Sequence, residues 1–414
     1  MNKRIYLCLA HMSGEEQKFI KEAFYTNWVV PLGPNVNGFE ADLEEFVGEG
    51  KKVVALSAGT AAVHLALLAC GVGPGDEVIC QSFTFCASAH PITYLGGIPV
   101  FVDSERDSWN MDPGLLEEAI KDRIDSTGKK PKAIVPVYLY GMPAKIDEIM
   151  AIADRYDIPV IEDAAEGFGS QFDGRTCGTF GKFGVLSFNG NKMITTSGGG
   201  ALICADEDTK KEIMFYATQA REAFPYYQHE QIGYNYRMSN ICAGIGRGQM
   251  TVARDHIAHH KHVYALYKKL LSDIEGIRLH ENPSFRYDSN YWLNTIILDP
   301  ALPVTGEEGT YRESVQGAVG GAAGVTHRAS SCHTNCEPHR NVEAMRMALD
   351  ASGIESRPLW KPMHLQPVYA QNPSYVNGVS EELFKCGLCL PSGPCVTDED
   401  VMFVVEEIKR CIRK

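Results

Sequence analysis

The fold is decided by the stretch Val53-Val54-Ala55-Leu56-Ser57-Ala58-Gly59-Thr60-Ala61-Ala62, in which an apolar strand leads through a turn of small residues into a helix. Apolar residues at three- and four-residue spacing continue this helix to Cys70. The same alternation recurs outward to Cys204 and is typical of a mostly parallel sheet covered by helices. We therefore expect an α/β fold with strands at Val53–Leu56, Glu77–Cys80, Val100–Val102, Ala133–Tyr138, Val160–Asp163, Val185–Phe188 and Ala201–Cys204.

The chain beyond this sheet has a different pattern. A long helical stretch from about Asn240 to Asp273 leads away from the sheet, and a second α+β segment follows it. We expect a large domain over residues 1–260 and a smaller domain over residues 261–414. Within the smaller domain, Thr305–Arg340 is rich in Gly, Ala, Ser and His and has little periodicity, so it is predicted to be an inserted surface loop.

Composition narrows the classes of function. The 414 residues carry a formal net charge of −13, which opposes binding to nucleic acid or to an anionic membrane surface. The apolar stretch near the N-terminus is too short for a secretory signal, and no run approaches the length of a membrane span. We therefore expect a cytoplasmic protein. The 13 cysteines are scattered singly through apolar segments, as reduced and buried thiols are.

The most informative motif is Ser187-Phe188-Asn189-Gly190-Asn191-Lys192-Met193, which runs on to the glycines at 198–200. It places a lysine just past an apolar strand, among small and polar residues whose backbone can approach a ligand closely. Such a lysine can form a Schiff base with an aldehyde cofactor. Taken alone, a loop lysine is more often only a solvated charge.

A second motif, Val160-Ile161-Glu162-Asp163-Ala164-Ala165-Glu166-Gly167, ends a strand with an acidic residue. A cofactor that acts as an electron sink needs a protonated pyridine nitrogen, and a buried carboxylate facing that nitrogen keeps the proton there. Asp163 is the candidate for this carboxylate. The alternative for Asp163 is a helix N-cap or a partner of the helix dipole, and the presence of Lys192 favours the cofactor.

Further strand ends offer groups for a phosphate and for a ring. The turn around Gly59 opens a helix, so its backbone N–H groups and the Thr60 hydroxyl can bind an anion, and Ser187 can add another hydroxyl. Phe85 follows a strand and offers an aromatic face. Each feature is weak alone, because such turns cap many helices and such a phenylalanine is commonly part of a core. Together they all lie beyond carboxyl ends of strands, where ligands bind in α/β sheets.

In this order, the motifs resemble those of the sugar aminotransferase family called DegT/DnrJ/EryC1/StrS, a branch of the fold-type I pyridoxal-phosphate (PLP) enzymes. The resemblance extends from Asn27-Trp28 to Arg357–His364. It implies a three-layer αβα large domain with a smaller α+β C-terminal domain. It also implies that Lys192 carries the cofactor, that Asp163 faces the pyridine nitrogen and that Phe85 stacks on the ring.

The same resemblance assigns the other cofactor contacts. Gly59, Thr60 and Ser187 match the phosphate site, and Glu166 matches a residue near the cofactor hydroxyl. The stretch Gly233-Tyr234-Asn235-Tyr236-Arg237 matches a loop whose asparagine reaches the cofactor phosphate of the neighbouring subunit. Asn235 therefore implies a homodimer with shared active sites.

Three residues in the last matching stretch are candidates for substrate binding. Arg357, Lys361 and His364 would hold a substrate phosphate, and ordinary surface charges are the alternative.

The resemblance also suggests a substrate class. The Glu-Asp-Ala-Ala-Glu run ending at Glu166 and the Asn-Gly-Asn-Lys run ending at Lys192 look like those of enzymes that aminate C4 of nucleotide-linked 4-keto-6-deoxy sugars, of the perosamine or bacillosamine type. L-Glutamate is the implied amino donor, and surface polysaccharide or glycan synthesis is the implied pathway. Lys192 then serves as both tether and general acid and base. The alternative is the 3-keto branch, which tends to show glutamine and histidine where this chain has Glu166 and Gly167.

Other functions fit the sequence less well. A sugar dehydratase of this family would have histidine in place of Lys192, and a PLP-binding regulator would carry an added DNA-binding segment. A dinucleotide oxidoreductase would show Gly-x-Gly-x-x-Gly after the first strand, which this chain lacks. No metal is expected, because the spacing within the Cys- and His-bearing stretch fits no standard zinc site. That stretch contains His327, Cys332, His333, Cys336 and His339.

Overall fold

The computed structural model describes residues 4–306 and 336–412. Its centre consists of two four-stranded sheets with the strand orders β1-β9-β8-β5 and β14-β3-β2-β4. Parallel bridges between the β4 and β5 segments join the two into one larger sheet. Strand β9 runs antiparallel to both of its neighbours, and the other pairings are parallel. The predicted α/β fold with a mostly parallel sheet is therefore confirmed. The strands are β1 (Lys52–Leu56), β2 (Glu77–Gln81), β3 (Ile98–Val102), β4 (Ala133–Val135), β5 (Ile161–Asp163), β8 (Phe183–Ser187), β9 (Gly200–Cys204) and β14 (Ser374–Tyr375).

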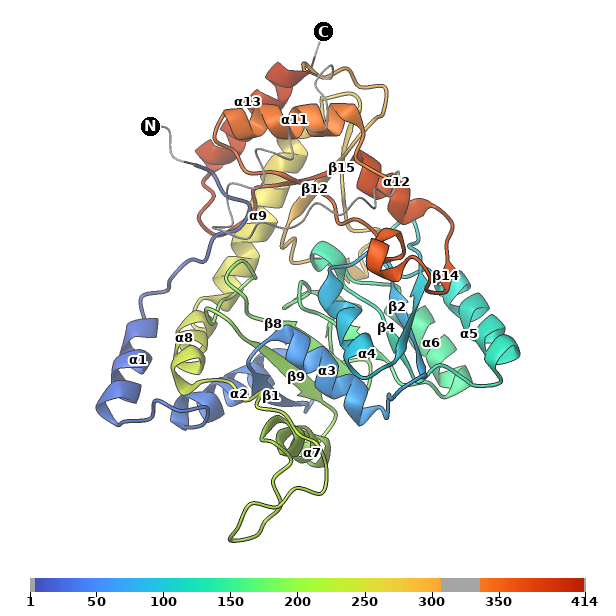
Figure 1. Ribbon diagram of the computed structural model, residues 1–414. Coiled ribbons are helices and arrows are strands. Elements are labelled where there is room, and N and C mark those ends of the chain that lie inside the picture. The colour runs from blue at the N-terminus through green and yellow to red at the C-terminus, as the bar shows by residue number, and fades with distance from the viewer. Residues whose placement is uncertain (1–3, 307–335, 413–414) are drawn as a thin grey trace.

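Helices cover both faces of this sheet, as Figure 1 shows. Side chains alternate along each strand, so Val53 and Ala55 pack into one core while Val54 and Leu56 pack into the other. The first core is closed by α2 (Pro34–Val47), α5 (Pro113–Thr127) and α6 (Ile146–Tyr156). The second is closed by α3 (Gly59–Ala69), α4 (His90–Tyr94) and α7 (Glu207–Ala217). These are the three layers that the family resemblance implied.

One predicted strand ends earlier than expected, and one predicted helical stretch is divided into two helices. The strand expected over Ala133–Tyr138 stops at Val135, because Pro136 has no N–H to donate to a neighbouring strand. The helical stretch expected from Asn240 to Asp273 is two helices, α8 (Asn240–Met250) and α9 (Ala253–Leu271). The Thr251 hydroxyl between them donates to the carbonyl of Gly248 and so competes with the helical pattern.

The C-terminal part of the chain forms a second, antiparallel sheet of order β10-β12-β15-β13 with its own core. The strands are β10 (Ile277–Leu279), β12 (Asn294–Leu298), β13 (Arg357–Pro358) and β15 (Gly387–Leu390), and the helices are α11 (Arg340–Ala351), α12 (Val379–Cys386) and α13 (Asp398–Cys411).

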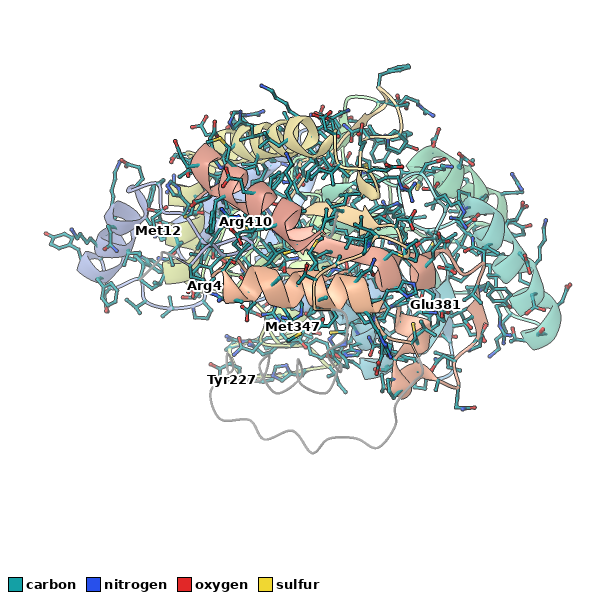
Figure 2. All side chains as sticks on the ribbon, turned by 90° about the horizontal axis from the view of Figure 1, so that it is seen from above. Arg4, Met12, Tyr227, Met347, Glu381 and Arg410 are labelled. Carbon is teal, nitrogen blue, oxygen red and sulfur yellow. The ribbon has the colours of Figure 1, made fainter. Side chains whose placement is uncertain are left out.

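Several segments of the chain make contacts that connect the large sheet region with the C-terminal region. Strand β14 returns to pair with β3 of the large sheet, and β11 (Tyr287–Asp288) pairs with β6 (Gln171–Phe172), which also pairs with β7 (Arg175–Thr176). Near the N-terminus, before α1 (Glu16–Tyr25), Arg4 forms an ion pair with Asp350 of α11, and Figure 2 shows Arg4 beside that helix. We propose that the boundary between the two domains lies near residue 260, within α9 (Ala253–Leu271).

Short 3-10 helices complete the described chain: η1 (Cys86–Ser88), η2 (Leu139–Gly141), η4 (Met363–Leu365) and η5 (Pro367–Tyr369). Among residues 4–306 and 336–412, no helix is both long enough and apolar enough to span a membrane. Most of the predicted Thr305–Arg340 loop, including His327, Cys332 and His333, lies outside the described residues.

Candidate active site

A cavity of about 270 Å³ lies at one edge of the large sheet, where β1, β5 and β8 end. The turns that follow these strands form its walls, because the carboxyl ends of parallel strands meet at the same edge. Seven of the predicted site residues line it together: Gly59, Thr60, Phe85, Asp163, Glu166, Ser187 and Lys192.

Lys192 lies in the turn after β8. Its backbone N–H donates to the carbonyl of Asn189 at 2.9 Å, which closes the turn and directs the side chain into the cavity. The amine Nζ lies 3.4 Å from Oε1 of Glu166 and 4.1 Å from the centre of the Trp292 ring. The lysine side chain is 13% exposed, so the amine is held in a largely dry site and can still be reached by a ligand.

Glu166 is fixed on two sides. One carboxylate oxygen faces Lys192, and the other accepts a hydrogen bond from the backbone N–H of Tyr140 at 2.7 Å. Tyr140 adopts a left-handed backbone conformation with φ of 56°, which turns its N–H toward the acid. Burial raises the pKa of Glu166, and the positive charge of Lys192 opposes this rise.

Asp163 ends β5, is buried and lines the cavity. Its oxygens accept hydrogen bonds from the Ser88 hydroxyl at 2.6 Å and from the backbone N–H of Ala165 at 3.1 Å. Burial raises the pKa of Asp163, because the charged form loses its solvent. A protonated ring nitrogen facing this carboxylate would stabilise its charged form.

The turn that opens α3 contributes a part of the lining that can bind an anion. Helix α3 begins at Gly59, and Ala58 at its N-cap position has no side chain that could cap the first N–H groups. A Cβ at Gly59 would lie 3.1 Å from Cβ of Ser187, and one at Gly200 would lie 2.3 Å from the backbone nitrogen of Gly59. Small residues therefore let the turn after β1 lie close to Ser187 and Gly200, and Gly59, Thr60 and Ser187 line the same cavity, where N–H groups and hydroxyls can bind a phosphate.

Two aromatic side chains form one wall. Phe85 is half exposed and lines the cavity, and the centre of its ring lies 5.6 Å from that of Trp360. Trp360 also stacks on Tyr140, whose hydroxyl accepts a hydrogen bond from the Trp360 backbone N–H. A planar ligand can thus bind between the strand ends and an aromatic face.

These groups fit PLP. The cavity lining offers a buried carboxylate that would pair with a ring nitrogen, an amine that would bond to the aldehyde, and an N–H-rich turn that would bind the phosphate. Lys192, Asp163 and the turn at Gly59 and Ser187 would hold the cofactor.

Four predicted site residues lie elsewhere. Asn235 is exposed and does not line the cavity of its own chain. Arg357 is exposed near Glu355, and the Lys361 amine donates to the carbonyl of Cys336. The remaining residue, His364, pairs through Nδ1 with the hydroxyl of Ser82 at 2.6 Å, and burial lowers its pKa.

The sequence analysis missed three residues that the structure brings to the site. Ser88 bonds to Asp163, Trp292 contacts Lys192, and Trp360 packs on Phe85. Ser88 lies only three residues after Phe85, so the motif around Phe85 contained a signal for it. Trp292 is 100 positions from Lys192, and no local pattern links the two.

Comparisons with known proteins agree with this geometry. The model of the DegT/DnrJ/EryC1/StrS aminotransferase family matches residues 10–308 and 310–409. EpsN of Bacillus subtilis, named as a pyridoxal phosphate-dependent aminotransferase, is 44% identical over 411 residues, covering 98% of this chain and 95% of that protein. GDP-perosamine synthase of Escherichia coli O157:H7 is 32% identical, covering 96% of this chain and 95% of that protein.

A solved structure gives the same result. The crystal structure of a DegT DnrJ EryC1 StrS aminotransferase from Brucella abortus superposes with a TM-score of 0.82 at 28% identity, covering 97% of this chain and 96% of that one. The cavity contains the groups that PLP needs, and the family model covers nearly the whole chain. The chain therefore belongs to the DegT/DnrJ/EryC1/StrS aminotransferase family and is a pyridoxal-phosphate-dependent aminotransferase.

Proposed function

We propose that this enzyme transfers an amino group from L-glutamate to C4 of a nucleotide-linked 4-keto-6-deoxy sugar, with Lys192 as its catalytic residue. The observation that carries the proposal is the position of the Lys192 amine, largely buried in a cavity that is also lined by Asp163, Glu166 and the first turn of α3. The sugar is supported by the family resemblance of the runs ending at Glu166 and Lys192, and by the name of the related GDP-perosamine synthase.

Each residue of the cavity has a defined task in this proposal. PLP, when bound, supplies an electron sink for the carbon that carries the transferred nitrogen. Lys192 removes a proton from one carbon and returns it to another, and its flexible four-carbon stem allows one amine to serve both half-reactions. Asp163 keeps the proton on the ring nitrogen, and the N–H groups at Gly59 hold the phosphate.

The proposed enzyme is a homodimer with shared sites. Asn235 is exposed and lies outside the cavity of its own chain, which suits a residue that serves a partner subunit. Large apolar side chains are also exposed near it, including Tyr227 at 78% and Ile232 at 82%. A second copy would cover them. The mass of the protein in solution tests this part of the proposal.

The test replaces the lysine. We expect Lys192→Ala to lower turnover at least a thousandfold, because the variant loses both tether and general base. Borohydride should trap the cofactor covalently on the wild-type protein at Lys192 and not on the variant. Lys182→Ala is the matched control, since this exposed lysine precedes the opposite end of β8. Substantial turnover by Lys192→Ala would refute the assignment.

The substrate is tested separately with nucleotide-linked sugars. We expect 4-keto-6-deoxy sugars to become aminated at C4 in the presence of glutamate, as measured by mass spectrometry and NMR of the product. Amination of a 3-keto sugar in their place would favour the alternative branch. Either result leaves the role of Lys192 to be decided by the lysine variants.

A further inference from the structure

Trp292 contacts the amine at the centre of the proposed mechanism. Nζ of Lys192 lies 4.1 Å from the centre of the Trp292 ring, and Trp292 also lines the cavity. The tryptophan is 1% exposed and is rigidly packed, whereas a lysine side chain is flexible. We propose that Trp292 is a positioning residue that holds the Lys192 amine in place whenever the lysine is not bonded to the cofactor.

Trp292 is fixed by hydrogen bonds to the lysine turn and to the acidic turn. Its indole N–H donates to the carbonyl of Asn191 at 2.7 Å, directly before Lys192, and its backbone N–H donates to Oδ1 of Asn290 at 2.8 Å. The amide of Asn290 donates in turn to the carbonyls of Glu166 and Phe168. One hydrogen-bonded unit therefore sets the ring, the lysine turn and the carboxylate relative to one another.

Close packing supports this unit at Gly141. Gly141 has φ of 92°, and a Cβ there would lie 1.9 Å from Oδ1 of Asn290. Any larger residue would push Asn290 away from Trp292. The turn that contains Gly141 also contains Tyr140, whose N–H fixes Glu166. The same backbone turn thus places both groups that contact the amine.

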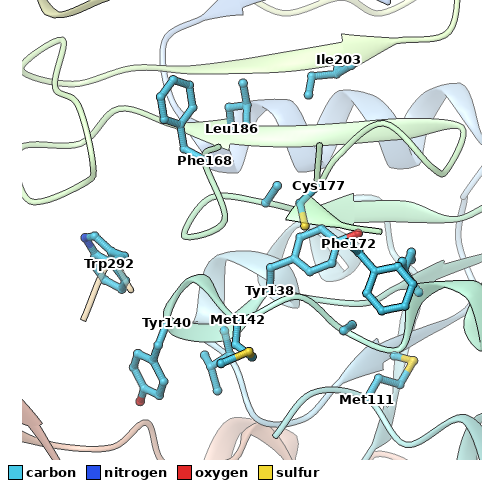
Figure 3. Packing of buried hydrophobic residues seen from close by; sticks show 14 of the residues in the cluster. Met111, Tyr138, Tyr140, Met142, Phe168, Phe172, Cys177, Leu186, Ile203 and Trp292 are labelled. Atoms are coloured by element: carbon cyan, nitrogen blue, oxygen red, sulfur yellow. The ribbon is translucent and has the colours of Figure 1, made fainter. Parts of the chain in front are cut away.

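Trp292 and Lys192 lie on different segments of the chain, which allows the tryptophan to serve as a separate contact for the lysine amine. Trp292 lies between β11 and β12, whereas Lys192 follows β8. Figure 3 shows Trp292 on a separate segment at one side of the packed cluster that also contains Tyr138 and Phe172. Its ring is therefore presented to the cavity by the C-terminal part of the chain, on a different segment from Lys192.

Proton transfer by a lysine is favoured by such a contact. In each half-reaction the lysine is released and must transfer a proton at a defined distance, and an amine on a four-carbon stem would otherwise sample many positions. An ammonium group is attracted to the face of an indole ring, more strongly when water is excluded. Glu166 lies 3.4 Å from the same amine, so ring and carboxylate together define one position for it. The inference rests on the proposed role of Lys192 and is independent of the identity of the sugar.

The experiment measures how readily the amine reacts in the full-length, cofactor-free protein. An amine-specific reagent is added at neutral pH, and the rate of labelling at Lys192 is followed by peptide mass spectrometry. We expect Trp292→Leu to label about fivefold faster than wild type, because loss of the aromatic face releases the ammonium group. Trp292→Phe, which keeps an aromatic face and loses the N–H, should label within about twofold of wild type.

Two controls make the result decisive. Trp109→Leu removes a buried tryptophan that stacks on His280 outside the cavity lining, and it should leave the labelling rate at Lys192 unchanged. Trp292→Met replaces Trp292→Leu if the leucine variant does not fold, as judged by circular dichroism. In turnover, Trp292→Leu should lower kcat about fivefold with little change in KM for the sugar, and Trp292→Phe should restore most of kcat.

Some outcomes would overturn the proposal. Labelling of Trp292→Leu and Trp292→Met at the wild-type rate would show that the ring does not hold the amine. Equal acceleration in Trp292→Phe and Trp292→Leu would assign the effect to the bond with Asn191 and not to the ring face. Failure of borohydride trapping at Lys192 would instead refute the proposed role of the lysine, so the two failures are distinguishable.

Discussion

Strand β5 ends with two buried acids that face opposite sides of the sheet, and they have different surroundings. Glu162 accepts hydrogen bonds from the hydroxyl of Tyr138 and from the backbone N–H groups of Gly178 and Gly181. Asp163 faces the cavity. Burial raises the pKa of both carboxyl groups. The side facing Glu162 is filled by donors from the same chain, whereas the side facing Asp163 leaves room for a ligand.

This difference separates a structural acid from a functional one. A buried carboxylate that is surrounded by its own chain's donors is part of the packing, and removing it leaves those donors without an acceptor. A buried carboxylate beside a cavity is destabilised until a cation binds there. Asp163 lies beside the cavity and so is of the second kind, and we propose that a protonated cofactor ring is the cation that binds there. Local sequence does not distinguish the two acids, because they are neighbours on one strand.

The largest expected effect comes from Asp163→Asn. We expect kcat to fall about a hundredfold to a thousandfold, because a neutral amide cannot keep the ring nitrogen protonated. The cofactor-free variant should lose no more than about 1 kcal/mol of unfolding free energy, since asparagine can still bond to Ser88. Steady-state kinetics and urea denaturation measure the two quantities.

The pH dependence sharpens the same comparison. Because burial raises the folded-state pKa of Asp163, the contribution of this carboxyl group to stability is present at low pH and is lost as pH rises through that pKa. The unfolding free energy of cofactor-free wild type should therefore fall relative to Asp163→Asn as pH increases. The opposite trend would mean that Asp163 is stabilised as an anion by the protein itself, and that it needs no bound cation.

Glu162→Gln should lower stability more than activity, which is the reverse of the effects expected for Asp163→Asn. An amide replaces one acceptor oxygen by an NH2 group that points at N–H donors from Gly178 or Gly181. We expect the unfolding free energy to fall by about 2 kcal/mol, while kcat of the folded enzyme changes less than about threefold. Thermal unfolding and kinetics at a temperature where the variant is folded test this. A stable but inactive variant would contradict the division between the two acids.

The residues that could be predicted from sequence are those that follow a strand directly. Lys192, Asp163 and Gly59 each come just after an apolar run, so the position of the strand fixes the position of the side chain. The layers of the large domain could be predicted for the same reason, because strand and helix periodicities are local. The sequence was less reliable at Pro136 and Thr251, where one residue interrupts a strand or a helix.

The residues that could not be predicted depend on long-range packing. Trp292 reaches Lys192 only because Asn290 and Gly141 hold its segment against the acidic turn. Trp360 reaches Phe85 through a contact with Tyr140, which lies far away in the chain. The return of β14 to the large sheet is likewise a tertiary pairing that its two residues do not signal by themselves.

Among the three acids, the smallest effect in free energy is expected for Glu166→Gln, where a tenfold change in kcat corresponds to about 1.4 kcal/mol. Glu166 lies between the two kinds of acid, since one oxygen accepts a hydrogen bond from the chain and the other faces the Lys192 amine. Glutamine keeps the bond to Tyr140 and loses the charge, so we expect kcat to fall about tenfold at neutral pH. Burial raises the pKa of Glu166, so the wild-type carboxyl is neutralised at a higher pH than an ordinary glutamate. The ratio of wild-type to variant kcat should therefore shrink as pH falls, and a ratio independent of pH would show that the charge of Glu166 does not act on Lys192.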